Sequence, residues 1–330
     1  MRRSVPQIIS LTAILIGTAL FAATLLLIDR AQTVEALARL GRALPLVLLP
    51  SALWHLLRTA GWFACFPVET RPSFWRVFRV RLAADGVAYF TIRGVTSEPL
   101  RVLLLLDHTP ATVSAAATVL ERTAMGIVSV VIVGLCAGVA TSSDAVPPDW
   151  QAVFRGIAVA AIVILILTAL LLTRSGRYIG PLFAWIHRRT GWAWTGGQVV
   201  AFISQVEATC LHLARTDRSR VRVLAGLAVA CFGMMVLEVL LVFWAIGSPV
   251  SMWAGAIIET FTRTASIFGG AIPANLGALE ASNVMIVNAL GLAGAGSLAL
   301  ARRIRSLFWA ALGLALYPRD TIRRQPAQAT

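Results

Sequence analysis

Long apolar segments, separated by short polar ones, extend along almost the whole chain. A membrane-spanning α-helix needs about 20 residues that are mostly apolar. Segments of this character occupy residues 8–28, 44–66, 111–140, 152–173, 223–246, 252–268, 280–292 and 297–317. The pattern predicts an all-α fold, a polytopic integral membrane helix bundle with about eight transmembrane helices (seven to nine) in a single membrane domain over residues 1–330.

Two segments interrupt this pattern. Residues 83–107 consist of two moderately apolar halves separated by polar, glycine and proline residues at 93–99, and neither half is long enough to cross a membrane. Residues 269–279 form a second break that is rich in glycine and contains a proline. Because irregular backbone at membrane depth must be sheltered by protein, we expect two broken or re-entrant segments, one in each half of the chain.

Four further segments combine apolar residues with basic ones, at residues 30–42, 68–82, 181–194 and 198–214. Basic and aromatic side chains at helical spacing are typical of helices that lie at a membrane surface. We therefore expect four interfacial helices, with residues 68–82 on the cytoplasmic side.

Composition strengthens the membrane interpretation. The sequence is 58% hydrophobic and 13% charged, with a mean hydropathy of +0.79. An ordinary soluble domain is about 25% charged, so a soluble two-domain enzyme of this length is excluded. All 29 basic residues are arginine, and the formal net charge is +14.

The positions of the arginines predict the orientation, because cytoplasmic loops of membrane proteins collect basic residues. Residues 174–222 hold many of them and are expected to be a cytoplasmic, interfacial segment. The N-terminus and the short tail 319–330 are expected in the cytoplasm as well, whereas residues 141–151 contain no arginine and are expected outside. Because topology accounts for most of the charge, nucleic acid is not expected as a partner.

The sequence carries no recognisable catalytic or metal-binding motif. Its four cysteines stand alone in apolar surroundings, and its four histidines lack the spacing of metal ligands. A Gly-x-Ser-x-Gly element and a Walker sequence are both absent from the sequence. We expect no cofactor and no metal, and we interpret His55 as a contact between helices in preference to a proton relay.

Charged residues within the predicted spans are the informative ones. A charge at the centre of a membrane helix costs about 2.5–3.5 kcal/mol on insertion scales, so it needs a partner or a function. Glu259 and Arg263 are one turn apart and can pair within their helix. Glu121 and Arg122 are adjacent, so they point about 100° apart and each must meet another helix. Two interpretations stay open: ion pairs that hold the bundle together, and a ligand site.

The two interruptions favour a ligand site. Glu98 and Arg101, at the first, would share one face of a helix. At the second, a half-helix would begin after Pro273, and the exposed N–H groups and positive end of such a half-helix bind anions. The predicted ligand-binding residues are Glu98, Arg101, Glu121, Arg122, Glu259, Arg263, Pro273, Asn275, Gly277, Glu280 and Arg302.

These residues also resemble the motifs of a known family. Residues 94–101 are similar to a Gly-Glu-x-x-Arg element, Glu121 and Arg122 to a Glu-Arg pair that opens a span, and residues 273–280 to a Pro-Gly-Gly-x-Gly-x-x-Glu element. An arginine of the last span matches Arg302 or Arg303. The sequence departs from these motifs in two places. The glycine and glutamate of the first motif are further apart than in the family, and an Ala-Asn pair replaces the two glycines of the last motif. The chain resembles, over nearly its whole length, the bacterial membrane family typified by the transmembrane part of lysylphosphatidylglycerol synthase.

The resemblance implies a bacterial inner-membrane protein that handles lipids. The aminoacyl-transferase domain of the synthase has no counterpart in these residues, so lipid lysylation is not expected. We expect translocation or binding of a lipid with an anionic headgroup, which could be a phospholipid, a polyprenyl lipid or a hopanoid. The alternative, which we favour less, is a membrane-embedded transferase that acts on a polyprenyl-linked or phospholipid substrate. Enzymes of lipid biosynthesis are conceivable partners of residues 174–222, although attraction of these arginines to anionic lipid is the simpler account.

Overall fold

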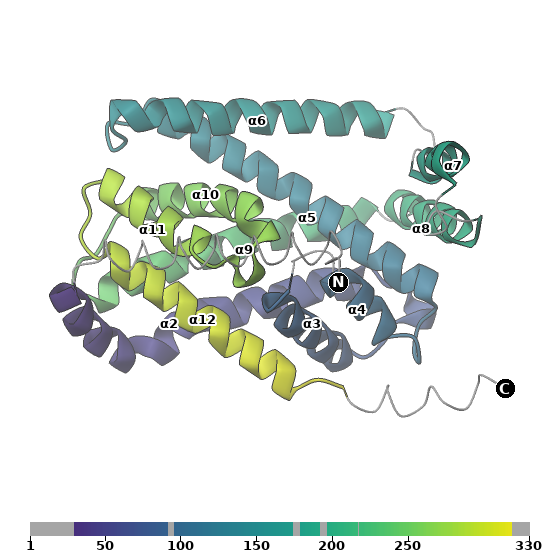
Figure 1. Cartoon of the computed structure of the whole chain (residues 1–330), viewed down its shortest axis with the longest axis horizontal. Coiled ribbons are helices and arrows are strands. Elements are labelled where there is room, and N and C mark those ends of the chain that lie inside the picture. The colour runs from purple at the N-terminus through teal and green to yellow at the C-terminus, as the bar shows by residue number, and fades with distance from the viewer. Residues whose placement is uncertain (1–29, 92–95, 174–178, 192–196, 217, 319–330) are drawn as a thin grey trace, which may run out of the picture.

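The computed structural model describes residues 30–91, 96–173, 179–191, 197–216 and 218–318, and these residues are mainly helical (Figure 1). The predicted span 8–28 and the tail 319–330 lie outside the described residues, as do parts of 174–222. The helices are α2 (Arg30–Ala64), α3 (Phe74–Tyr89), α4 (Ser97–Leu103), α5 (Ala111–Ala140), α6 (Pro148–Thr173), α7 (Ile179–Thr190), α8 (Gly197–Thr216), α9 (Arg218–Ala245), α10 (Met252–Phe268), α11 (Ala278–Ala289) and α12 (Ala295–Ala315), with short 3-10 turns at Val68–Thr70, Gly269–Ala271 and Pro273–Asn275.

Four helices of the described residues are long and apolar enough to cross a membrane, at Leu40–Ala64, Ala111–Ala140, Pro148–Leu170 and Ser219–Ala245. They agree with four of the predicted spans and establish a polytopic helical membrane protein. One boundary differs from the prediction. Residues 30–42, expected as a separate interfacial helix, continue without a break into the span of α2.

The first interruption is a hairpin made by α3 and α4. Helix α3 ends at Tyr89, and α4 begins at Ser97 after a segment that is only partly described. The outer ends of the two arms meet, because the Thr109 hydroxyl donates a 2.9 Å hydrogen bond to the carbonyl oxygen of Thr70. The chain therefore enters the bundle and returns to the same end, which confirms a re-entrant segment here.

The second interruption is a hairpin made by α10 and α11, whose arms were counted above as two spans. Helix α10 begins beside the α5–α6 turn, where the Trp253 indole donates a 3.0 Å hydrogen bond to the Ser143 hydroxyl. The end of α11 returns to the same region, because Leu290 packs against the same buried apolar cluster as Trp253 and Ile246. In Figure 1 the two hairpins reach inward from opposite ends of the bundle.

Helix α3 corrects the prediction of a cytoplasmic surface helix at residues 68–82. Only a 3-10 turn forms at Val68–Thr70, and the helix that follows is buried on one face against α12 and α2. Glycines allow its close crossing with α12: a Cβ atom added at Gly313 would lie 2.1 Å from the Leu82 carbonyl oxygen, and one added at Gly86 would lie 2.8 Å from that of Ala310. This crossing sets α3 and α12 side by side.

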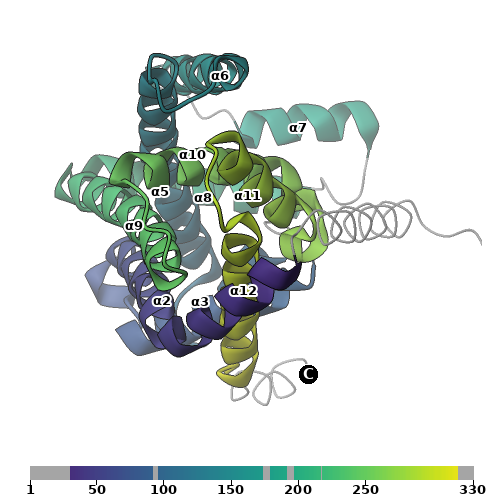
Figure 2. The ribbon, with the colours of Figure 1, turned by 90° about the vertical axis from the view of Figure 1, so that its left-hand side faces the viewer.

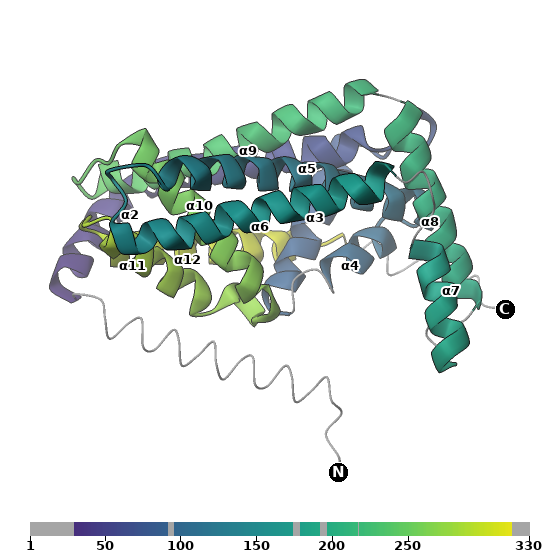
Figure 3. The same cartoon turned by 90° about the horizontal axis from the view of Figure 1, so that it is seen from above.

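Helices α6, α7 and α8 lie on the outside. Helix α6 packs on α5, where Gly134 allows close contact with Ala161, and exposes an apolar face that includes Ile162 and Leu167. Helices α7 and α8 lie across one end of the bundle in Figure 3, and α7 projects to one side in Figure 2. The remaining helices α2, α3, α5, α9 and α12 pack on one another and on the two hairpins.

Candidate functional site

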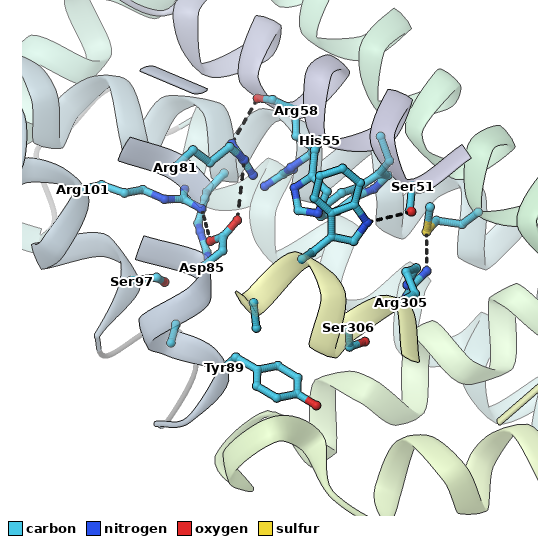
Figure 4. A pocket seen from close by; sticks show the side chains of 16 residues that line it. Ser51, His55, Arg58, Arg81, Asp85, Tyr89, Ser97, Arg101, Arg305 and Ser306 are labelled. Atoms are coloured by element: carbon cyan, nitrogen blue, oxygen red, sulfur yellow. Dashed lines mark hydrogen bonds and ion pairs between the residues drawn. The ribbon is translucent and has the colours of Figure 1, made fainter. Parts of the chain in front are cut away.

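A cavity of about 290 Å³ lies beside the tip of the first hairpin (Figure 4). Helices α2, α3 and α12 supply most of its wall, and α4, α5 and α9 complete it. The lining residues are Ser51, Trp54, His55, Arg58, Arg81, Asp85, Ala88, Tyr89, Ser97, Arg101, Arg122, Met235, Arg305, Ser306, Trp309 and Ala310. Five of these side chains are arginines, and one is a carboxylate.

Glu121 lies behind the cavity lining and pairs with two of the arginines that line it. Its carboxylate is completely buried, and Oε1 lies 3.1 Å from Nη2 of Arg58 and 3.5 Å from Nη1 of Arg81. The same Nη1 atom of Arg81 donates to the backbone carbonyl of Arg58 at 3.1 Å. Glu121 therefore joins α2, α3 and α5, which agrees with the expectation that it must find its partners on other helices.

Asp85 faces the cavity between two guanidinium groups. Its Oδ1 accepts a 2.7 Å hydrogen bond from Nη2 of Arg101, and its Oδ2 lies 3.8 Å from Nε of Arg81. Arg101 is almost fully buried, yet its Nε and Nη1 atoms have no hydrogen-bond partner among the described residues. The guanidinium carbon lies 5.4 Å from the centroid of the Trp62 ring, and the described residues leave part of the donor capacity of Arg101 unused.

Glu98 pairs with Arg122, across the helices α4 and α5, and also accepts a 2.9 Å hydrogen bond from the Ser97 hydroxyl. Glu98 and Arg101 both lie on α4, and Arg101 pairs with Asp85 of α3. Arg122 is the most exposed of the paired arginines here, with 45% of its side chain accessible.

A second cluster of charges extends away from the cavity through Arg305. Arg305 lines the cavity and pairs with Glu238, which also lies 3.6 Å from Arg302. Arg302 in turn contacts Glu259 at 2.7 Å, and Glu259 lies 3.0 Å from Arg263 within α10, as the spacing predicts. Arg302 also donates hydrogen bonds to Thr262 and Asn283. Helices α9, α10 and α12 are thus held by one chain of alternating charges, and Asn283 connects α11 to it through a hydrogen bond.

The tips of the two hairpins meet at Arg303. Its Nη1 atom donates to the Tyr89 hydroxyl at 2.7 Å and to the Ala274 carbonyl at 3.1 Å, and its guanidinium pairs with Glu280. The other oxygen of Glu280 accepts a 2.9 Å hydrogen bond from the backbone N–H of Gly277. The end of α3 and the start of α11 are therefore connected through α12.

The half-helix that follows the second break begins beyond Pro273, as the sequence predicts. Pro273 begins a 3-10 turn, and α11 begins only at Ala278, after Gly277 with its positive φ of 75°. The helix start is occupied by the carboxylate of Glu280, so an incoming anion would have to displace it. Asn275 is buried and packs against Gly269, where a Cβ atom would lie 1.9 Å from its Oδ1 atom.

Of the predicted site residues, Arg101 and Arg122 line the cavity, and Glu98 and Glu121 pair with residues that line it. The other predicted residues lie in the second cluster or at the second hairpin tip and do not line it: Glu259, Arg263, Pro273, Asn275, Gly277, Glu280 and Arg302. Sequence reasoning missed Arg58, Arg81, Asp85 and Arg305 as site residues. A signal was available for Arg58 and Arg305, since both are charges within predicted spans.

Aromatic residues line the cavity between the two charged regions (Figure 4). His55 lies 4.5 Å from Trp309 of α12 and 4.9 Å from Trp54, measured between ring centroids, which supports its interpretation as a contact between helices. Trp309 also donates a 2.8 Å hydrogen bond to the Ser51 hydroxyl. Figure 4 shows Arg101 and Arg305 on opposite sides of His55. The described residues contain no group of three His, Cys, Asp or Glu side chains that could hold a metal ion.

Comparison with known proteins gives one match. The model of a family described as the lysylphosphatidylglycerol synthase TM region matches residues 11–314. Among curated proteins and among solved structures, none was found to match the chain.

Proposed function

The chain belongs to the family of the lysylphosphatidylglycerol synthase TM region, and from this premise we propose that it binds and translocates a membrane lipid with an anionic headgroup. Membership places its function with membrane lipids. The cavity lined by five arginines is the observation that carries the proposal beyond the family. Phosphate groups of lipids are well matched to guanidinium groups, which donate two parallel hydrogen bonds.

The free N–H groups of Arg101 support an incoming ligand. Arg101 donates to Asp85 through Nη2, and its Nε and Nη1 atoms have no partner among the described residues, so a ligand oxygen that reaches them would leave the buried ion pair intact. Arg58 and Arg122 are accessible enough to approach the same ligand. Glu98 and Glu121 orient these arginines from behind the cavity wall.

Translocation is supported by the two hairpins. Re-entrant segments that meet near the middle of a membrane protein are typical of transporters, in which they surround the substrate site. Here the cavity lies beside the point at which the hairpin tips meet, at Tyr89 and Arg303. Opening toward one end or the other would expose the cavity to either side of a bacterial inner membrane.

The alternative function is a membrane-embedded transferase, and His55 is the residue that favours it. His55 lines the cavity, and its Nδ1 atom has no hydrogen-bond partner among the described residues, so it could serve as a base. A transferase would form product when the purified protein is incubated with a lipid extract. We rank it second because Asp85 and Glu121 are already held by arginines.

The proposal is tested by binding and by movement of lipid in reconstituted vesicles. We expect the wild-type protein to retain anionic lipids over phosphatidylcholine in native mass spectrometry and to move a fluorescent anionic lipid between leaflets in a dithionite assay. Arg101→Gln should weaken retention about tenfold, the effect of one charge-assisted hydrogen bond.

Arg79→Gln is the matched control, because Arg79 is an exposed arginine of α3 that does not line the cavity. Equal retention of anionic lipid by wild type, Arg101→Gln and Arg79→Gln, at equal protein levels, would show that the cavity is not the headgroup site. If the protein retains anionic lipid but does not move it between leaflets, the proposed binding stands and the proposed translocation is excluded.

A further inference from the structure

We infer that the cavity selects a headgroup with two negative charges, such as a phosphomonoester or a diphosphate, over a singly charged phosphodiester. The inference rests on the proposed function and specifies the substrate class of that site. It follows from how the arginines and carboxylates around the cavity are shared.

One positive charge is in excess on the side formed by α2, α3 and α4. There, three guanidinium groups, of Arg58, Arg81 and Arg101, share only the carboxylates of Glu121 and Asp85. Arg122 and Glu98 pair with each other and add no net charge. The unpaired Nε and Nη1 atoms of Arg101 show that the described acceptors do not satisfy the donors on this side.

A second positive charge is in excess on the side formed by α12. In the cluster that reaches the cavity through Arg305, three arginines share the two carboxylates of Glu238 and Glu259, and each carboxylate contacts two arginines. Arg303 and Glu280 balance each other and leave this excess unchanged. The described residues thus leave one excess charge on each side of the cavity.

Burial makes these two charges significant. Glu121, Glu238, Arg101 and Arg302 are all more than 95% buried, so water screens their fields weakly. A singly charged ligand would neutralise one side and leave the other unbalanced. A ligand with two negative charges would neutralise both sides. Its second charge would be attracted strongly, because the dielectric constant around these buried groups is low.

The wild-type protein provides the first test, through pH. A phosphomonoester gains its second charge near pH 6, whereas a phosphodiester keeps one charge from pH 5 to pH 8. We expect the affinity for short-chain phosphatidic acid to rise about tenfold between pH 5 and pH 8, and the affinity for short-chain phosphatidylglycerol to stay constant. Tryptophan fluorescence in detergent micelles is a suitable readout, since Trp54 and Trp309 line the cavity.

Two single variants locate the two charges. Arg305→Gln leaves Glu238 paired with Arg302, and Arg101→Gln leaves Asp85 beside Arg81, so neither strands a buried carboxylate. Each should reduce the preference for phosphatidic acid at pH 8 to near parity with phosphatidylglycerol. Arg79→Gln removes the same charge from an exposed position and should keep the full preference.

Soluble and lipid-borne ligands are separated by two further probes. Inorganic phosphate should give no fluorescence change at the concentration at which phosphatidic acid saturates the protein. Farnesyl diphosphate should bind at least as tightly as phosphatidic acid. Equal affinity for phosphatidic acid and phosphatidylglycerol at pH 8 would overturn the inference while leaving the proposed function intact. Absence of binding by both lipids at every pH would instead remove the proposed function.

Discussion

At the scale of single residues, the charges of this protein divide according to what surrounds them. Glu121 has no exposed surface and serves two arginines from other helices, whereas Glu98 is 24% exposed and pairs with an arginine that is 45% exposed. The same type of ion pair is therefore expected to contribute differently to the free energy of unfolding at the two positions. Burial removes the screening by water, and it also makes an unpaired partner costly.

Glu121→Gln tests this difference. We expect it to lower the free energy of unfolding by about 3–5 kcal/mol, because it leaves Arg58 and Arg81 without a buried carboxylate between them. Glu98→Gln should cost about 1 kcal/mol or less, as an accessible pair. Thermal unfolding of both variants in the same detergent gives the comparison, and equal losses would contradict the assignment of Glu121 as the structural centre of this cluster.

At the scale of elements, the crossing of α3 and α12 makes the cavity. Asp85 and Tyr89 come from α3, and Arg305 and Trp309 come from α12. This part of the cavity lining therefore forms only where the two helices are in contact. Gly86 and Gly313 permit this approach, because each faces the backbone of the other helix.

Helix α7 lies on the outside and contacts α8. It exposes Trp185, and the Arg189 guanidinium lies 5.8 Å from the centroid of that ring. An exposed aromatic residue beside an arginine is typical of an interfacial helix.

Gly313→Ala is expected to separate α3 from α12. The added Cβ atom would lie 2.1 Å from the Leu82 carbonyl oxygen, so backbone must move, at a cost of about 1–3 kcal/mol. The displacement should also weaken binding of anionic lipid.

Gly138→Ala in α5 is the control, since its Cβ atom would meet nothing within 4 Å. The two variants are compared by melting temperature and by lipid retention. A Gly313→Ala protein that is as stable as Gly138→Ala and binds lipid equally well would show that the close crossing is not needed.

At the scale of the whole molecule, the two ends of the bundle differ in charge and in structure. One end carries the α5–α6 turn and the start of α10, joined by Ser143 and Trp253. The other carries α7 and α8 with their arginines, and in Figure 1 α12 ends toward this side. Because basic segments stay in the cytoplasm, the second end is predicted to be cytoplasmic.

Thiol labelling of intact cells checks this orientation. In a background without the four free cysteines, Ser143→Cys should react with a membrane-impermeant maleimide from outside, whereas Arg188→Cys on α7 should react only after lysis. The reverse pattern would invert the predicted topology, and labelling of both positions in intact cells would exclude residues 174–222 from the cytoplasm.

The sequence alone determined the class of this protein, because membrane residence depends on the length and apolarity of local segments. It located the two interruptions for the same reason, since glycine, proline and charge break an apolar helix where they stand. It also identified Glu121 and Arg122 as residues that must look to other helices, from their angular separation.

Only the tertiary structure decided which charges meet. The basic and aromatic residues around Arg81 predict a surface helix, whereas Arg81 is buried against Glu121 of α5. The two residues are 40 positions apart, and spacing along one helix carries no information on such pairs. Likewise, Glu98 and Arg101 share a helix yet pair with different helices. The cavity arises where α2, α3 and α12 cross, and crossing depends on long-range packing, which a local sequence pattern does not encode.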